Sequence, residues 1–341
     1  MDRTVRRVSL ALQGGGAHGA FTWGVLDRLL QEEDLEIAGI SGTSAGALNG
    51  AALKAGMIEG GRAGARARLD RLWDHVAAIG DFRMVPWLQP FLPAMRFWQS
   101  ASAAFLPFSP EALAAQVYSP HAWGDGWQNP LEPAVRDLDF SEVCTDAGPR
   151  LFISATNVRT GKIKVFTGTG ITPEAVLASA CLPTVFQTVE IDGEAYWDGG
   201  YAGNPALFPL YEPDLPDDIL VVSINPQRRE ELPQTALEIQ NRVNEISFNA
   251  SLLGELRAIN FVRRLIREGR MERGAMKEVN VHMIADDGLM NALSANSKLS
   301  PTPLLLERLK TAGRKAATLF LENGGAKIGH DASIDLPGML S

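Results

Sequence analysis

Residues 8–46 read VSLALQGGGAHGAFTWGVLDRLLQEEDLEIAGISGTSAG, and this stretch decides the fold. Residues 8–12 form an apolar run interrupted by one serine, which predicts a short buried strand. Residues 17–30 carry apolar side chains at helical spacing and predict a helix. Residues 36–40 predict a second strand, and residues 45–54 are rich in helix formers. Two strands that are each followed by a helix indicate parallel strands joined by crossovers.

The rest of the chain predicts more strands and helices, with no linker-like composition between them. Strands are expected at 151–155, 162–166, 219–224 and 279–284, and helices at 237–267, where Gly254 could interrupt, and at 304–321. We therefore expect one domain over residues 1–341. Its parts would be a core of about 8–224, a helical flap insertion of about 82–130 and a helical C-terminal extension of about 235–325.

The composition excludes several classes of protein. Of the 341 residues, 45% are hydrophobic and 21% charged, which suits an ordinary globular protein. The net charge of −8, without a basic stripe, argues against a nucleic-acid partner and against loose electrostatic attachment to anionic lipid. The two cysteines, Cys144 and Cys181, make neither a disulfide framework nor a zinc cluster. The sequence contains no run of about 20 apolar residues, so no membrane-spanning helix is predicted.

The N-terminus has some features of a secretory signal. Three arginines precede an uncharged run from Val8 to Leu26. The glycine triplet at 14–16 breaks the apolar stretch after Leu12, whereas a signal needs a longer apolar segment. We therefore expect a cytoplasmic protein, with hydrophobic contact to a lipid surface as its one option for membrane association.

The segment from Phe82 to Phe108 differs in character from the rest. It carries seven Phe or Trp residues and four prolines, which prevent one long helix. Such a segment could be an apolar flap over a pocket or a surface that touches lipid. It could equally be a piece of core built from short helices.

The first motif is GGGAHG at residues 14–19, between the first strand and its helix. Consecutive glycines let the backbone approach a ligand closely, and the helix N-terminus offers free N–H groups, so the motif suits an anion. That anion could be a dinucleotide phosphate or the oxyanion of acyl transfer. A dinucleotide site typically also has an acidic residue at the end of the second strand. This strand instead ends at Ser41-Gly42.

The second motif is Gly42-Thr43-Ser44-Ala45-Gly46, again between a strand and a helix. This is G-x-S-x-G in the context where a strained turn projects a nucleophilic serine. A small-residue turn that only lets the helix pack closely would look the same in isolation. Because the glycine loop would follow the adjacent strand, one motif can supply the nucleophile and the other the oxyanion donors.

The third motif is Asp198-Gly199-Gly200. Ser44 needs a base, and Ser44, Asp198 and His282 occur in the order of an α/β-hydrolase triad. His282 is better explained as a strand residue with a satisfied hydrogen bond. A carboxylate can itself be the base, and burial would raise its pKa. The competing interpretation of Asp198 is a turn aspartate that binds its own backbone.

Together the three motifs resemble the patatin-like phospholipase family of lipid acyl hydrolases. The resemblance extends to Ala155-Thr156-Asn157, to residues 178–186 (ASACLPTVF) and to Asn204-Pro205, and it covers roughly Val8 to Ile224. It implies an α/β fold, a three-layer α/β/α sandwich with a mainly parallel central sheet. The family often has a basic residue where His18 stands and an aspartate where Gln13 stands.

The resemblance also implies a Ser–Asp dyad without histidine. It assigns the nucleophile to Ser44, the base to Asp198 and the oxyanion hole to the backbone of Gly14, Gly15 and Gly16. The supporting motif positions are Gly19, Gly42, Gly46, Gly199 and Gly200. It implies no cofactor and no metal. We expect His18 to serve polar packing or loop orientation.

The expected activity is hydrolysis of a fatty acyl ester or phospholipid, of the phospholipase A or lysophospholipase type. The partners implied are this substrate and a transient contact with a membrane or lipid-granule surface. Three alternatives remain open: an intracellular polyester (polyhydroxyalkanoate) depolymerase with the same dyad, a catalytically inert lipid-surface adaptor, and a nucleotide-binding oxidoreductase. The intact serine, aspartate and glycine loop argue against the last two.

Overall fold

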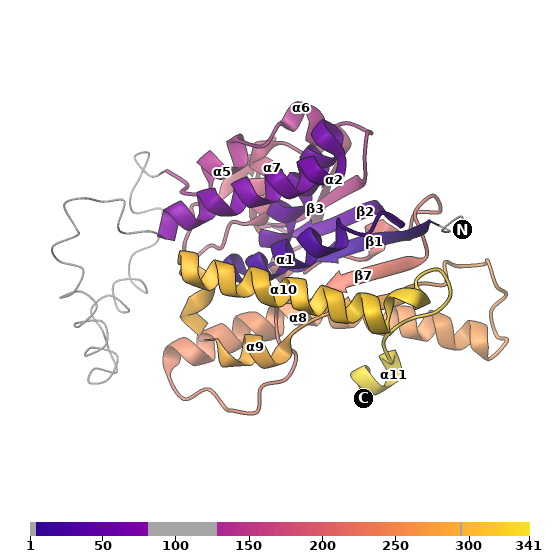
Figure 1. Cartoon of the computed structure of the whole chain (residues 1–341). Coiled ribbons are helices and arrows are strands. Elements are labelled where there is room, and N and C mark those ends of the chain that lie inside the picture. Colours follow the sequence, from indigo (N-terminus) through magenta and orange to yellow (C-terminus); the bar gives the residue numbers. More distant parts are fainter. Residues whose placement is uncertain (1–4, 81–127, 294) are drawn as a thin grey trace.

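The structure is a computed structural model that describes residues 5–80, 128–293 and 295–341 (Figure 1). The segment from Phe82 to Phe108, and with it nearly all of the expected flap insertion, lies outside the described residues. In the described part, no helix is long and apolar enough to cross a membrane.

A single sheet forms the centre of the fold. Its strands are β1 (Arg6–Leu12), β2 (Leu35–Thr43), β3 (Arg150–Asn157), β4 (Ile163–Thr167), β5 (Val189–Ile191), β6 (Glu194–Asp198), β7 (Asp218–Val222) and β8 (Asn280–Ile284). Their order is β5-β6-β3-β2-β1-β7-β8, and β4 pairs with β3. The five strands β3, β2, β1, β7 and β8 run parallel, and the β4, β5 and β6 pairings are antiparallel. The predicted parallel arrangement of the first two strands is confirmed.

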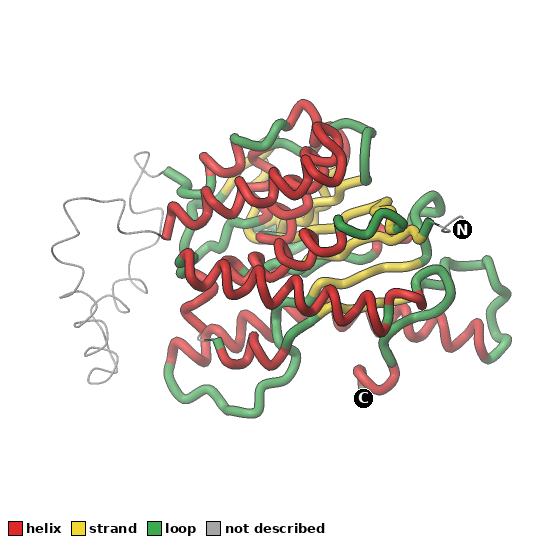
Figure 2. The backbone as a smooth tube through the Cα atoms, viewed as in Figure 1, coloured by secondary structure: helices red, strands yellow, loops and turns green. Residues whose placement is uncertain are grey.

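Helices connect and cover these strands (Figure 2). The α-helices are α1 (Gly19–Leu29), α2 (Ala45–Gly80), α5 (Glu132–Arg136), α6 (Phe140–Val143), α7 (Pro173–Ser179), α8 (Ala236–Arg267), α9 (Asp287–Ala292), α10 (Pro303–Asn323) and α11 (Leu336–Leu340). Short 3₁₀ turns complete the chain at η1 (Gly16–His18), η5 (Gly168–Gly170), η6 (Gly199–Tyr201), η7 (Phe208–Tyr211), η8 (Ala295–Leu299) and η9 (Gly325–Lys327).

Side chains that alternate along the strands build two hydrophobic layers. Leu10 and Leu12 of β1 face a core formed with α1, α2, α7 and α10. Ala11, between them, faces a second core formed with α8 and α11. Successive strand residues point to opposite faces of a sheet, so the two cores lie on its two sides. The arrangement is therefore the expected three-layer α/β/α fold, in which α1 and α10 lie side by side (Figure 1).

Two helices differ from their predicted form. The helix expected at 45–54 continues to Gly80 as α2, with a kink where Gly60 and Gly61 leave the helical region. The interruption suggested at Gly254 is wrong, because α8 runs continuously from Ala236 to Arg267. Tertiary packing of its inner face holds that helix together across the weak position.

Candidate active site

Ser44 lies in the tight turn between β2 and α2. Its φ of 55° is in the left-handed region, which costs a residue with a side chain about 1–3 kcal/mol and is typical of functional turns. The Ser44 N–H donates to Ser179 Oγ at 2.9 Å, and Ser179 Oγ donates to the carbonyl of Ser154 at 2.7 Å. The turn is thus fixed by the end of α7 and by β3, and Ser44 is almost fully buried.

The register of the sheet brings Asp198 next to this turn. β2 pairs with β3 as far as Thr43 opposite Ser154. At the next position Ala155 pairs with Asp198 of β6. Because β4 occupies the other edge of β3 there, β6 continues along the edge that β2 leaves. Asp198 is therefore paired with β3 one position further along than Thr43, the residue that precedes Ser44.

The Asp198 carboxyl is fully buried and only partly satisfied. Its Oδ1 accepts a hydrogen bond from the Gly200 N–H at 2.8 Å, as in a turn aspartate. Its Oδ2 has no ordinary hydrogen-bond partner in the described part of the chain. Burial raises the pKa of Asp198 to about 7, against the opposing hydrogen-bonding effects of Gly200 and of the Ser44 side chain. The serine hydroxyl is therefore close enough to influence the carboxyl, although no full hydrogen bond to Oδ2 is formed.

The glycine loop lies directly against Ser44. A Cβ placed on Gly14 would come within 2.6 Å of the Ser44 Cβ, so only glycine fits there. The Gly14 N–H donates to Asn204 Oδ1 at 2.6 Å and is occupied. Within the described residues, the N–H groups of Gly15 and Gly16 donate to no protein acceptor. Of the three predicted oxyanion donors, these two therefore have no acceptor in the part of the chain that the structure describes.

Gln13, directly before the glycine loop, anchors the loop to the end of β7. Its Oε1 accepts from the backbone N–H groups of Ile224 and Asn225 at 2.9 and 3.1 Å. Its Nε2 donates to the Asn204 carbonyl and to Asn249 Oδ1, each at 3.3 Å. The neutral amide thus satisfies donors and acceptors together, which an aspartate could not do.

Among the described residues, no histidine forms a hydrogen bond with Ser44. His282 Nε2 lies 2.8 Å from Asp218 Oδ1, both groups being buried, so the predicted hydrogen bond of a strand histidine is confirmed. Its Nδ1 has no hydrogen-bond partner among the described residues. His18 Nε2 lies 2.7 Å from Ser297 Oγ. Burial, aided by the charge of Lys298, lowers the pKa of His18 to about 3, which keeps the ring neutral at physiological pH.

Sequence reasoning missed several polar residues around the turn. Ser179, Asn204 and Asn225 are all buried or nearly so and bind the turn or the loop. Ser179 and Asn204 lie in the quoted segments 178–186 and Asn204-Pro205, although neither was assigned a role, and no local pattern marks Asn225. Burial raises the pKa of the nearby Cys181 thiol to about 12, so this cysteine is no nucleophile. Among the described residues, no cluster of three or more His, Cys, Asp or Glu could hold a metal ion.

Comparison with known proteins agrees with the motifs. A family model described as patatin-like phospholipase matches residues 10–211. No curated protein matches the chain. Among solved structures, VipD from Legionella pneumophila is 15% identical with a TM-score of 0.41, and the match covers 93% of this chain and 67% of VipD.

A second solved structure is the ExoU–SpcU complex of the type III secretion system of Pseudomonas aeruginosa. It is 17% identical with a TM-score of 0.34, and the match covers 94% of this chain. This chain spans about half, 52%, of the length of that matched chain. Because the family model covers more than half of its residues, the chain belongs to the patatin-like phospholipase family, a family of ester-hydrolysing enzymes.

Proposed function

We propose that this chain is a serine esterase that hydrolyses lipid acyl esters, of the phospholipase A or lysophospholipase type. Ser44 is the nucleophile and Asp198 its base, and Gly15 and Gly16 donate to the oxyanion. The observation that carries the proposal is the buried Asp198 carboxyl. Its Oδ2 lacks an ordinary hydrogen-bond partner in the described structure, and its pKa is raised to about 7 beside Ser44.

In the first half of the reaction, Asp198 Oδ2 takes the proton from Ser44 Oγ as the oxygen attacks the ester carbonyl. The C–O bond of the leaving alcohol then breaks, and the alcohol leaves with that proton. A base whose pKa lies near the working pH suits this transfer, because it is ionised yet still a good proton acceptor. The product of this half is an acyl-enzyme on Ser44.

In the second half, water attacks the acyl-enzyme. Asp198 accepts a proton from the water, the ester bond to Ser44 breaks, and the proton returns to Ser44 Oγ as the fatty acid leaves. No histidine is needed in either half, and His18 stays neutral at the far end of the loop.

Charge that develops on the carbonyl oxygen is stabilised by the glycine loop. The free N–H groups of Gly15 and Gly16 are the donors, and the start of η1 and α1 adds the positive end of a helix dipole. Losing one such donor typically costs about 3–4 kcal/mol in the transition state. Gly14 serves instead to anchor the loop, because its N–H is bound by Asn204.

The test is turnover of p-nitrophenyl esters with acyl chains from short to long, using the purified full chain. Ser44→Ala and Asp198→Asn should lose turnover and keep the wild-type circular dichroism. Phospholipid and lysophospholipid substrates then assign the type. Retained turnover in both variants would refute the dyad. Turnover lost in Ser44→Ala, with a preference for polyester granules over long-chain esters, would keep the dyad and replace the substrate.

A further inference from the structure

The 3₁₀ turn η8 (Ala295–Leu299) lies against the glycine loop, although more than 270 residues separate them. A Cβ on Gly16, whose φ is 58°, would overlap the backbone carbonyl of Lys298. His18, at the end of the loop, contacts Ser297 Oγ through Nε2 at 2.7 Å. η8 therefore packs against Gly16 and His18, whereas Ser44 packs against Gly14.

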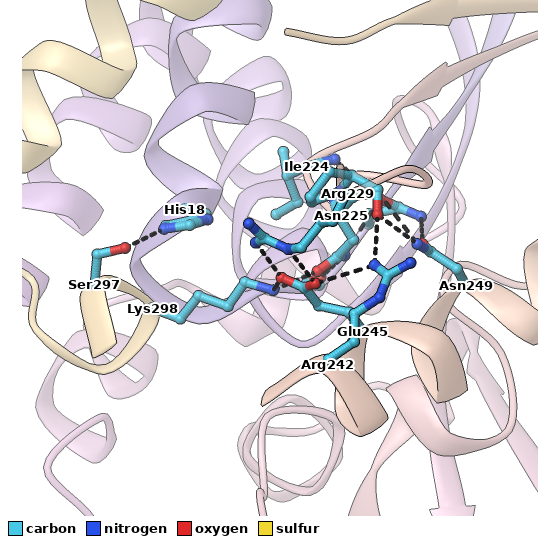
Figure 3. A network of polar contacts seen from close by, with 12 residues as sticks. His18, Ile224, Asn225, Arg229, Arg242, Glu245, Asn249, Ser297 and Lys298 are labelled. Atoms are coloured by element: carbon cyan, nitrogen blue, oxygen red, sulfur yellow. Dashed lines mark hydrogen bonds and ion pairs between the residues drawn. The ribbon is translucent and has the colours of Figure 1, made fainter. Parts of the chain in front are cut away.

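The side chain of Lys298 points toward Asn225 and Glu245 (Figure 3), and Asn225 connects it to the other end of the loop. Lys298 Nζ donates to Asn225 Oδ1 at 2.9 Å. Asn225 Nδ2 in turn donates to the Gly14 carbonyl at 2.7 Å. Lysine is a donor only, so it fixes the amide orientation in which Nδ2 faces Gly14. The ammonium group thus helps to hold Asn225 in the orientation in which Nδ2 donates to the Gly14 carbonyl, which also accepts from Asn204 Nδ2 at 3.3 Å.

Glu245 of α8 holds Lys298 in this position. Glu245 Oε1 lies 3.2 Å from Lys298 Nζ, and both carboxylate oxygens also accept from Arg229 at 2.7 and 2.8 Å. Burial alone would raise the pKa of Glu245, but Arg229 and Lys298 outweigh it and lower the pKa to about 2. The carboxylate stays ionised, and Arg242, at 3.3 Å, gives it a third cationic partner.

We propose that Lys298 is a positioning residue for the loop of residues 14–16. Through Asn225 it fixes the Gly14 carbonyl, and through its backbone it confines Gly16, so that the N–H groups of Gly15 and Gly16 keep their orientation. Asn225, Glu245 and Lys298 all lie beyond residues 10–211, the part that the family model matches. The C-terminal part of the chain thus helps to hold the oxyanion hole in place. This inference rests on the proposed function.

The test compares Lys298→Met with Lys310→Met in the full chain on a p-nitrophenyl ester. Lys310 is a matched control: its side chain is 20% exposed against 19% for Lys298, and it forms an ion pair with Asp70 away from the loop. Oxyanion donors act mainly in the transition state. We therefore expect kcat to fall about tenfold to a hundredfold in Lys298→Met with KM changed less than twofold. Both parameters should stay within twofold in Lys310→Met.

A double variant separates positioning from general destabilisation. If Lys298 acts through Asn225, adding Lys298→Met to Asn225→Ala should lower kcat less than twofold further, whereas independent effects would multiply. Multiplied effects, or a Lys298→Met enzyme with wild-type kcat, would overturn the proposal. Lys298→Met should fold, because Glu245 keeps Arg229 and Arg242. If it does not, Lys298→Gln replaces it with the same expected outcomes. Turnover that survives Ser44→Ala would instead refute the proposed function.

Discussion

Replacing Asp198 by asparagine should change how stability depends on pH. The pKa of Asp198 is raised from 3.8 to about 7 by burial, so the folded protein retains a proton there that the unfolded chain releases. Between pH 4 and 7 the folded state binds more protons, and the free energy of unfolding therefore falls as the pH rises. At 1.36 kcal/mol per pKa unit, the whole loss is about 4 kcal/mol, of which about 2.5 kcal/mol falls between pH 5 and 8.

Asparagine cannot ionise, so the variant escapes this loss. Its amide would also leave a buried donor without a partner at the position of Oδ2, at a cost of about 1–3 kcal/mol. That cost is the same at every pH. The informative quantity is therefore how the difference in the free energy of unfolding between variant and wild type changes with pH. Urea denaturation of wild type and Asp198→Asn at pH 5 and pH 8 measures it, because all other titrating groups cancel.

The free energy of unfolding of Asp198→Asn, relative to that of wild type, should rise by about 2.5 kcal/mol from pH 5 to pH 8. Ser44→Ala is the control. It keeps the buried carboxyl and loses a group that lowers its pKa, so its stability should fall with pH at least as steeply as that of wild type. An equal difference between wild type and Asp198→Asn at both pH values would refute the raised pKa, and with it the argument for Asp198 as base.

Three further predictions concern the same site. Since Asp198 must be ionised to act, kcat/KM should rise tenfold per pH unit below about 7 and level off above; a profile flat from pH 5 to 8 would contradict this. Gly14→Ala would place a Cβ 2.6 Å from the Ser44 Cβ, so we expect about 1–3 kcal/mol of destabilisation by thermal unfolding and loss of turnover; wild-type values for both would disprove the close packing. Iodoacetamide at pH 8 should label half-exposed Cys144 and spare buried Cys181, because burial raises the pKa of Cys181 to about 12. Peptide mapping that finds Cys181 alkylated in the folded protein would count against this burial.

Local patterns predicted the parts of the fold that one element decides by itself. The strand expected at 8–12 is the centre of β1, and the helix expected at 304–321 is α10 within two residues at each end. The strand expected at 279–284 is β8. In each of these, apolar spacing alone marks the buried face. The short strands β5 and β6 were not predicted, because three to five residues with mixed polarity carry no periodicity.

The residues of the candidate site also fall into two groups: those that a local motif marks, and those whose role depends on tertiary contacts. Ser44 and the glycine loop are marked by motifs that follow strand ends, so their positions could be read from the sequence. Whether Asp198 is a turn aspartate or a base could not be decided from spacing. In the structure Oδ1 accepts from the turn, while Oδ2 has no hydrogen-bond partner among the described residues, so the same carboxyl is compatible with both roles. The support from Lys298 depends on tertiary contacts across more than 270 residues, which no local pattern reveals.

The central claim is that Ser44 is the nucleophile, and a covalent trap tests it most directly. A long-chain p-nitrophenyl alkylphosphonate releases nitrophenol when it captures a nucleophilic serine, and mass spectrometry of the digested protein locates the adduct. We predict one phosphonyl group per chain, on the peptide that contains Ser44, with none in Ser44→Ala and slower capture in Asp198→Asn. An adduct on another residue, or equal labelling of wild type and Ser44→Ala, would contradict the account.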